Sequence, residues 1–127
     1  AIEMVAGPQP DFQIVPSEGD HAAEYGDDLR AAISSMREKT DGVLVFVDLL
    51  GGTPFNQAMM IAQDIDEVEV VTGANLPMLI ELMFLRDGAT LENLAAQAVE
   101  VGHEGIVHRV LEATAPVDTF DDMEDGI

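Results

Sequence analysis

The sequence contains no cysteine and no tryptophan, and it has few basic residues. Without cysteine, disulfides, thiolate metal sites and cysteine nucleophiles are excluded. Five Lys and Arg residues stand against 25 Asp and Glu residues, which gives a formal net charge of −20. So few cations cannot form the positive patch that a nucleic-acid backbone requires, and they disfavour an anionic membrane surface. The five are Arg30, Arg37, Lys39, Arg86 and Arg109.

Long apolar segments are missing as well. No apolar run reaches the ~18 residues of a membrane-spanning helix. The first residues also lack the basic segment followed by an apolar one that a signal peptide would have. Apolar residues nevertheless make up 47% of the 127 residues, too many for an acidic disordered chain. We therefore expect one small acidic domain without membrane insertion.

Hydrophobic periodicity predicts strands that alternate with helices. Helices are expected over residues 22–39, 54–64, 77–86 and 91–102, and strands over residues 11–15, 43–47, 67–72 and 106–111. The run from Val43 to Val47 is apolar throughout, which is typical of a central parallel strand buried on both faces. This alternation predicts an α/β layer fold with a mostly parallel sheet. The methionines expected in the core are Met59, Met60, Met78 and Met83.

The two ends of the sequence differ in character. Residues 1–6 have the pattern of the last turns of a helix, which Gly7 and Pro8 would stop. A sequence that begins inside a helix is expected to be a piece of a longer protein. Residues 118–127 are rich in acidic side chains, and we expect them to be loosely ordered.

The residues after the predicted central strand carry the most chemical information. Asp48 ends that strand, Gly51 and Gly52 follow, and Thr53 with Pro54 opens a helix as its N-cap and first residue. Amides, a helix N-terminus and a hydroxyl at this place form a site suited to phosphate. Asp48 would act there by accepting the ring N–H of a histidine. The same residues fit equally well a tight turn with ordinary capping.

Three motifs in collinear order identify a resemblance. The first is Val43-Leu-Val-Phe-Val-Asp-Leu-Leu-Gly-Gly-Thr-Pro-Phe-Asn-Gln-Ala58, the second is Gly73-Ala-Asn-Leu-Pro-Met-Leu79, and the third is Ala98-Val-Glu-Val-Gly-His-Glu-Gly105. With the loop Pro16-Ser-Glu-Gly19, they resemble the mannose/fructose/sorbose family of enzyme IIA components of the bacterial phosphotransferase system. The family's first turn reads Asp-x-x-Gly-Gly-Ser/Thr-Pro-x-Asn. The resemblance covers about residues 1–112.

The resemblance implies a doubly wound, mostly parallel sheet with helices on both faces. Its strand order is 2-1-3-4-5, with strand 1 missing from this sequence and an antiparallel last strand that is exchanged in a homodimer. Residues 1–112 would form this domain, and residues 113–127 an acidic C-terminal tail. Because the missing strand is central, either residues before Ala1 or another chain must fill its place.

The resemblance also implies an activity in the cytoplasm, with no cofactor and no metal. A histidine takes a phosphoryl group from the phosphocarrier HPr and passes it to enzyme IIB. Asp48 matches the aspartate that supports this histidine, and Thr53 the active-site hydroxyl. Gly51 and Gly52 match the loop around the phosphate, and Asn75 lies in a loop expected to flank the same site.

The phospho-accepting histidine itself has no match in this sequence. In the family it stands in a His-Gly pair after the first strand, and that strand precedes Ala1. His21, His103 and His108 do not match it, and none is expected to bind a metal. We expect His21 to be a solvated loop side chain and the other two to have surface or dimer-contact roles. The acidic surface is expected to attract a basic-faced phosphocarrier.

Three other functions stay open at this stage. The chain could be a regulatory relative that binds partners without transferring phosphate, or the phosphotransfer subunit of a dihydroxyacetone kinase. The second motif argues against the kinase subunit. A receiver-type domain phosphorylated on Asp48 is disfavoured, because Lys39 precedes Asp48 whereas such domains need a lysine after a later strand.

Overall fold

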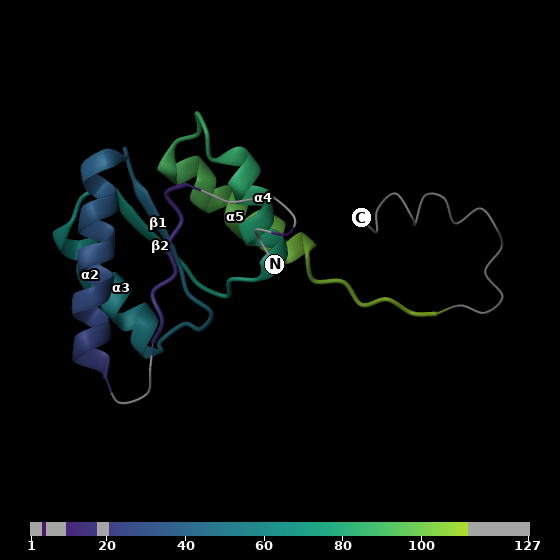
Figure 1. Ribbon diagram of the computed structural model, residues 1–127. Coiled ribbons are helices and arrows are strands. Elements are labelled where there is room, and N and C mark those ends of the chain that lie inside the picture. Colours follow the sequence, from purple (N-terminus) through teal and green to yellow (C-terminus); the bar gives the residue numbers. More distant parts are fainter. Residues whose placement is uncertain (1–3, 5–9, 18–20, 112–127) are drawn as a thin grey trace.

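The computed structural model describes residues 4, 10–17 and 21–111. These residues form four helices and two strands (Figure 1). The helices are α2 (Ala22–Lys39), α3 (Thr53–Asp64), α4 (Leu76–Leu85) and α5 (Leu91–Glu104), and the strands are β1 (Val43–Phe46) and β2 (Val68–Val71). Each lies within two residues of its predicted range. Apart from Met4, the expected opening helix lies outside the described residues, as does the acidic tail. No described helix has both the length and the apolarity that a membrane crossing requires.

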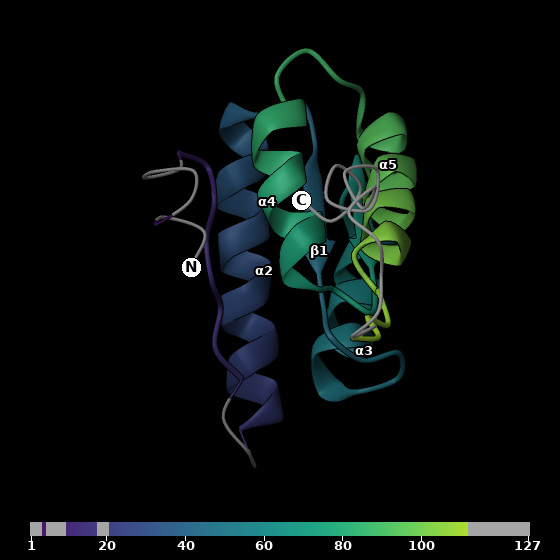
Figure 2. The same ribbon diagram turned by 90° about the vertical axis from the view of Figure 1, so that its right-hand side faces the viewer.

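The two strands form a parallel sheet with helices on both faces. β1 and β2 pair in register from Val43 with Val68 to Phe46 with Val71. Figures 1 and 2 show α2 and α3 on one face of this sheet and α4 and α5 on the other. The expectation of an α/β fold with a parallel sheet and helices on both faces is confirmed for the described residues.

Alternation along β1 divides the core into two clusters. Val43 and Val45 contact the cluster that α2 and α3 cover, whereas Leu44 and Phe46 contact the cluster beneath α4 and α5. Both faces of β1 are therefore covered, as the apolar run predicts. Val43 is the one buried residue of this strand, however, because among the described residues β1 has a neighbouring strand on one side only.

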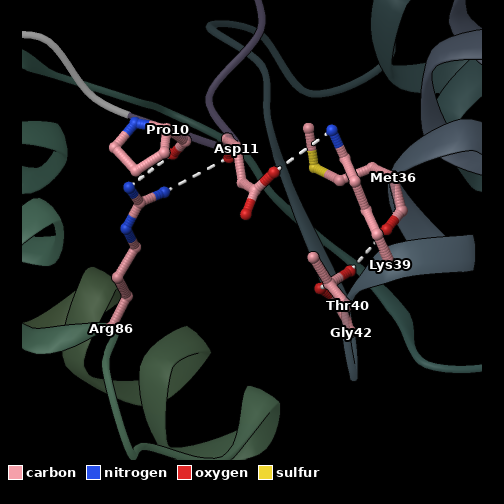
Figure 3. Close-up of polar contacts among 7 residues, drawn as sticks. All are labelled: Pro10, Asp11, Met36, Lys39, Thr40, Gly42 and Arg86. Carbon is pink, nitrogen blue, oxygen red and sulfur yellow. Dashed lines mark hydrogen bonds and ion pairs between the residues drawn. The ribbon is translucent and has the colours of Figure 1, made fainter.

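The expected strand at residues 11–15 is not formed, and this prediction is wrong. Side chains hold the segment instead, as Figure 3 shows. Arg86, at the end of α4, donates to the backbone carbonyls of Pro10 and Asp11. The Asp11 carboxylate lies 3.3 Å from Nζ of Lys39, at the end of α2. A strand is defined by backbone bonds to a neighbour, and the described chain offers this segment none.

The expected last strand at residues 106–111 is also absent, for the same reason. The segment leaves α5 without pairing to β1 or β2. Its apolar side chains are consequently exposed, with Ile106 at 75% and Leu111 at 95%. The sequence pattern thus identifies a segment suited to a sheet, but a single described chain does not supply its neighbour.

The methionine prediction is correct for only part of the set. Met78 is buried in the cluster beneath α4 and α5. Met59 and Met60 are 41% and 55% exposed, so the prediction is wrong for them. The buried face of α3 contains Ala58 and Ile61, and the two methionines lie outside this face.

Candidate functional site

The predicted site residues lie at the carboxyl edge of the sheet. Asp48 follows β1 at this edge, and residues 72–75 follow β2. The N–H of Ala74 donates to the carbonyl of Val47 at 3.1 Å, which holds the two connections together. The loop that carries Asp48 and the loop that carries Asn75 therefore lie side by side, as the parallel strands require.

The connection from β1 to α3 has the geometry of a glycine turn. Gly51 has a φ of +90°, a conformation in which a side chain would be strained. Gly52 is the N-cap, and Thr53 is the first helical residue. The expectation of Thr53 as N-cap is therefore wrong by one position. Asn56, which the sequence left without a role, donates through its side chain to the carbonyl of Gly51 at 3.4 Å.

The start of α3 lacks a side-chain cap. Its N-cap, Gly52, makes no side-chain cap hydrogen bond, and neither does His21 at the start of α2. By contrast, Asn75 and Thr90 accept from first-turn amides at the starts of α4 and α5. The first amides of α3 and the positive end of its dipole therefore face the edge beside Asp48. Gly52 offers no side-chain oxygen to accept from these amides. This arrangement suits an oxyanion held beside the Thr53 hydroxyl.

Tyr25 is a residue of this region that sequence reasoning missed. It lies in the first turn of α2 and is only 6% exposed, packed in a cluster with Leu29, Ala58 and Ile61. Burial raises the pKa of its phenol above the ordinary 10.0, and the negative charge of Asp48 raises it further. The pKa of the Tyr25 phenol thus reports on the negative charge of the exposed Asp48 carboxylate. Its only sequence signal is its position as an aromatic residue in the first turn of an amphipathic helix.

Replacing Asp48 by asparagine is expected to lower the pKa of Tyr25, though not below 10.0, because burial persists. The chain has one tyrosine and no tryptophan, so the phenolate absorbance reports Tyr25 alone. Above pH 10.0 the unfolded chain releases the phenol proton first, so the free energy of unfolding should fall as pH rises toward the pKa of the folded state. Below pH 10.0 this contribution is complete.

The matched control for this titration is Asp28→Asn, an exposed aspartate on α2 one turn from Tyr25. It should leave the titration unchanged. Identical titrations for Asp48→Asn and the unmodified chain would contradict the placement of Asp48 beside the phenol.

Asn75 lies at the expected edge, but its amide already has partners. Its Oδ1 accepts from the Met78 N–H at 3.1 Å, and its Nδ2 donates to the Gly102 carbonyl at 2.9 Å. Both polar atoms of the Asn75 side chain are thus bound within the protein. That Asn75 flanks the site stays a prediction, and it would concern the backbone of its loop.

The histidines and acidic residues do not assemble a metal site in the described part of the chain. His21 Nδ1 lies 3.5 Å from the Glu24 carboxylate, and both side chains are more than 60% exposed. His103 and His108 are exposed at and beyond the end of α5.

The edge is an open surface. Asp48 and Thr53 are exposed, and Leu49 and Leu50 beside them are 66% and 77% exposed. A cleft of about 440 Å³ lies elsewhere, between residues 13–16 and α2, and contains none of the predicted site residues. Exposed leucines around the candidate anion site would suit a ligand carried by a protein better than a small molecule that a pocket encloses.

Comparison with known proteins gives consistent results. A family described as "PTS system fructose IIA component" matches residues 1–99. The chain is 38% identical over 108 residues to the PTS system mannose-specific EIIAB component of Escherichia coli K12, a match that covers 82% of this chain and 32% of that protein. It is 29% identical over 107 residues to the PTS system sorbose-specific EIIA component of Lacticaseibacillus casei, covering 82% of this chain and 75% of that one.

A solved structure is similar as well. The mannose/sorbose-specific IIA subunit of the phosphotransferase system from Enterococcus faecalis superposes with a TM-score of 0.77 at 29% identity. The match covers 90% of this chain and 85% of that one. The chain spans about a third of the length of the mannose-specific relative, which is therefore considerably longer.

Proposed function

Since the chain belongs to the PTS fructose IIA component family, we propose that it is the phosphoryl-carrier part of a bacterial sugar phosphotransferase system in the cytoplasm. A histidine N-terminal to Ala1 would take the phosphoryl group from phosphorylated HPr and give it to enzyme IIB. The observation that carries this proposal is the α3 start without a side-chain cap, beside Asp48 at the carboxyl edge. The relatives' names include fructose, mannose and sorbose, so we assign the carrier step and no sugar.

The proposed step is a displacement at phosphorus. A ring nitrogen of the histidine attacks the phosphoryl group, a phosphorus–nitrogen bond forms, and the bond to the donor breaks with its electron pair leaving on the donor. Asp48 would accept the other ring N–H, which fixes the tautomer and keeps the attacking nitrogen basic. The amides of Gly51, Gly52 and Thr53, with the Thr53 hydroxyl, would hold the phosphoryl oxygens.

We propose that one further strand completes the sheet beside β1, in the order 2-1-3-4-5. β1 has β2 on one side, and its other edge has no backbone partner among the described residues. Helix α2 contacts β1 on one face, and Arg86 at the end of α4 reaches residues 10–11 (Figure 3). In the proposed order a strand inserted there would lie between β1 and residues 10–17, which agrees with the contacts of residues 10–11 to the ends of α2 and α4. The strand would end at the same edge as Asp48, which brings a histidine at its end next to the carboxylate.

We also propose that residues 106–111 pair with a second copy of the chain. Four of its six residues are apolar, three of them are β-branched, and the segment lies exposed beyond α5. Exchange of this strand between two subunits would bury Ile106, Val107, Val110 and Leu111. It would also supply the strand pairing that residues 106–111 do not make with the other described residues.

The deciding experiment is transfer of labelled phosphate through the upstream phosphorelay to HPr and then to this protein. The longer protein that carries the strand and the His-Gly pair is expected to be labelled on an acid-labile phosphohistidine, whereas the 127-residue chain should remain unlabelled. Labelling of the longer protein should persist in His21→Ala, since His21 is exposed beside Glu24. A longer protein that binds HPr without being labelled would instead support the regulatory alternative. Labelling of the 127-residue chain would overturn the assignment of the histidine.

A further inference from the structure

Helices α4 and α5 meet at a joint built around one amide side chain. Asn75 precedes α4, and its Oδ1 accepts the Met78 N–H at 3.1 Å while its Nδ2 donates to the Gly102 carbonyl at 2.9 Å. The first bond caps α4, and the second reaches the last turn of the antiparallel helix α5. Only one orientation of the amide satisfies both contacts, because the first partner is a donor and the second an acceptor.

Gly102, in the last turn of α5, and Gly105, its C-cap, lie where the two helices approach each other. A β-carbon on Gly102 would lie 2.6 Å from Cε of Met78, and one on Gly105 would lie 2.8 Å from the ring of Pro77. Gly105 has a φ of −74°, so it is required for the space and not for an unusual backbone conformation. The second and third sequence motifs therefore pack against each other at this joint.

The joint connects two parts of the molecule with different proposed roles. On one side, Ala74 bonds to Val47, the residue before Asp48. On the other side, Gly105 caps α5, and the exposed segment 106–111 begins directly after it. We propose that Asn75 is a positioning residue that fixes the end of α5 to the start of α4, and so determines where residues 106–111 leave the domain. Its consequence for pairing between subunits rests on the proposed homodimer.

An aspartate at position 75 separates this role from simple capping. Aspartate is as good an N-cap as asparagine, so the bond from Met78 would persist. A carboxylate has no N–H to donate, however, and it would place an acceptor oxygen against the Gly102 carbonyl. Thr90 offers the matched control, because its hydroxyl caps α5 by accepting from the Asn93 N–H at 3.1 Å within one helix.

Amide hydrogen exchange of the full chain tests the joint directly. Asn75→Asp should accelerate exchange at Gly105 and Ile106, which donate to Val101 and His103, by about tenfold or more. Thr90→Asp should leave these amides unchanged. If Asn75→Asp did not fold, Asn75→Ser would serve in its place, since serine also caps but is too short for both contacts. Wild-type exchange in a folded variant at position 75 would overturn the proposal.

Sedimentation equilibrium tests the consequence for assembly. Asn75→Asp should raise the dimer dissociation constant by about tenfold, while Thr90→Asp should not change it. If both variants dimerised like the unmodified chain, Asn75 would not govern the exit of residues 106–111. An unmodified chain that stayed monomeric would overturn the proposed strand exchange and leave the joint to be judged by hydrogen exchange.

Discussion

Replacing Asp48 by asparagine is expected to slow the proposed phosphoryl transfer from HPr roughly 100-fold or more, measured in a protein extended to carry the proposed histidine. Asparagine keeps the size of the side chain but cannot stabilise the positive charge that the imidazole ring acquires as its other nitrogen attacks. Asp48 is exposed at the end of β1, so the substitution should leave the fold intact. Rapid-quench measurement of the phosphohistidine formed in a single turnover gives this rate.

Asp41→Asn provides the control for that measurement. Asp41 is an exposed aspartate that precedes β1, at the opposite edge of the sheet, and the variant carries the same change in net charge. Its transfer rate should match that of the unmodified protein. Equal slowing by both variants would mean that net charge, acting on the encounter with HPr, explains the effect, and Asp48 would lose its role beside the histidine.

Replacing Ile61 by alanine is expected to lower the free energy of unfolding by about 3 kcal/mol. Ile61 is 1% exposed, and it belongs to the cluster that α2, α3 and the sheet share. The shorter side chain would leave a cavity between these layers, since the backbone of α3 cannot collapse into it. Equilibrium unfolding in urea should show a lower midpoint with an unchanged slope.

Met60→Ala on the same helix is the comparison. Met60 is 55% exposed, so its loss should change the free energy of unfolding by no more than about 0.5 kcal/mol. A loss of several kcal/mol for Met60 together with none for Ile61 would show that α3 is rotated about its axis relative to the described packing.

Local sequence information was sufficient for the helices and for the paired strands. The predicted range of α2 coincides with the observed Ala22–Lys39, because its apolar period and its stop at Thr40 are encoded within the helix itself. β1 was equally clear, since an apolar, β-branched run between turn residues has few other uses in a small domain.

The two unformed strands show what local pattern cannot supply. Residues 11–15 and 106–111 resemble strands in composition as much as residues 68–71 do. A strand nevertheless exists only when a neighbour accepts and donates its backbone bonds, and that neighbour is not part of the segment's own sequence. The prediction that Met59 and Met60 lie in the core is wrong for a related reason. Which side of a helix faces the sheet depends on how the helix packs.

The candidate site likewise has residues that the sequence could predict and residues that it could not. Asp48 and the glycine turn were predictable, because a strand end, two glycines and a helix start follow one another along the chain. Tyr25 and the second bond of Asn75 were not, because each depends on how one helix packs against another element. The sequence motif around Asn75 marks a structural joint as much as a site.

The attachment of residues 10–11 has a consequence for how the protein responds to ionic strength (Figure 3). Lys39 and Asp11 form an exposed pair of opposite charges, and such a pair weakens as added salt shortens the Debye length from about 10 Å at 0.1 M to about 3 Å at 1 M. Arg86 instead donates to neutral carbonyls at close range, an interaction that counter-ions screen little. In concentrated salt the Lys39–Asp11 contact should therefore weaken, while Arg86 keeps residues 10–11 bound to α4 and Val15 stays packed on the core. The same salt would screen the repulsion among the 25 acidic residues and so stabilise the domain. Added salt would therefore weaken one contact of residues 10–11 and stabilise the fold as a whole.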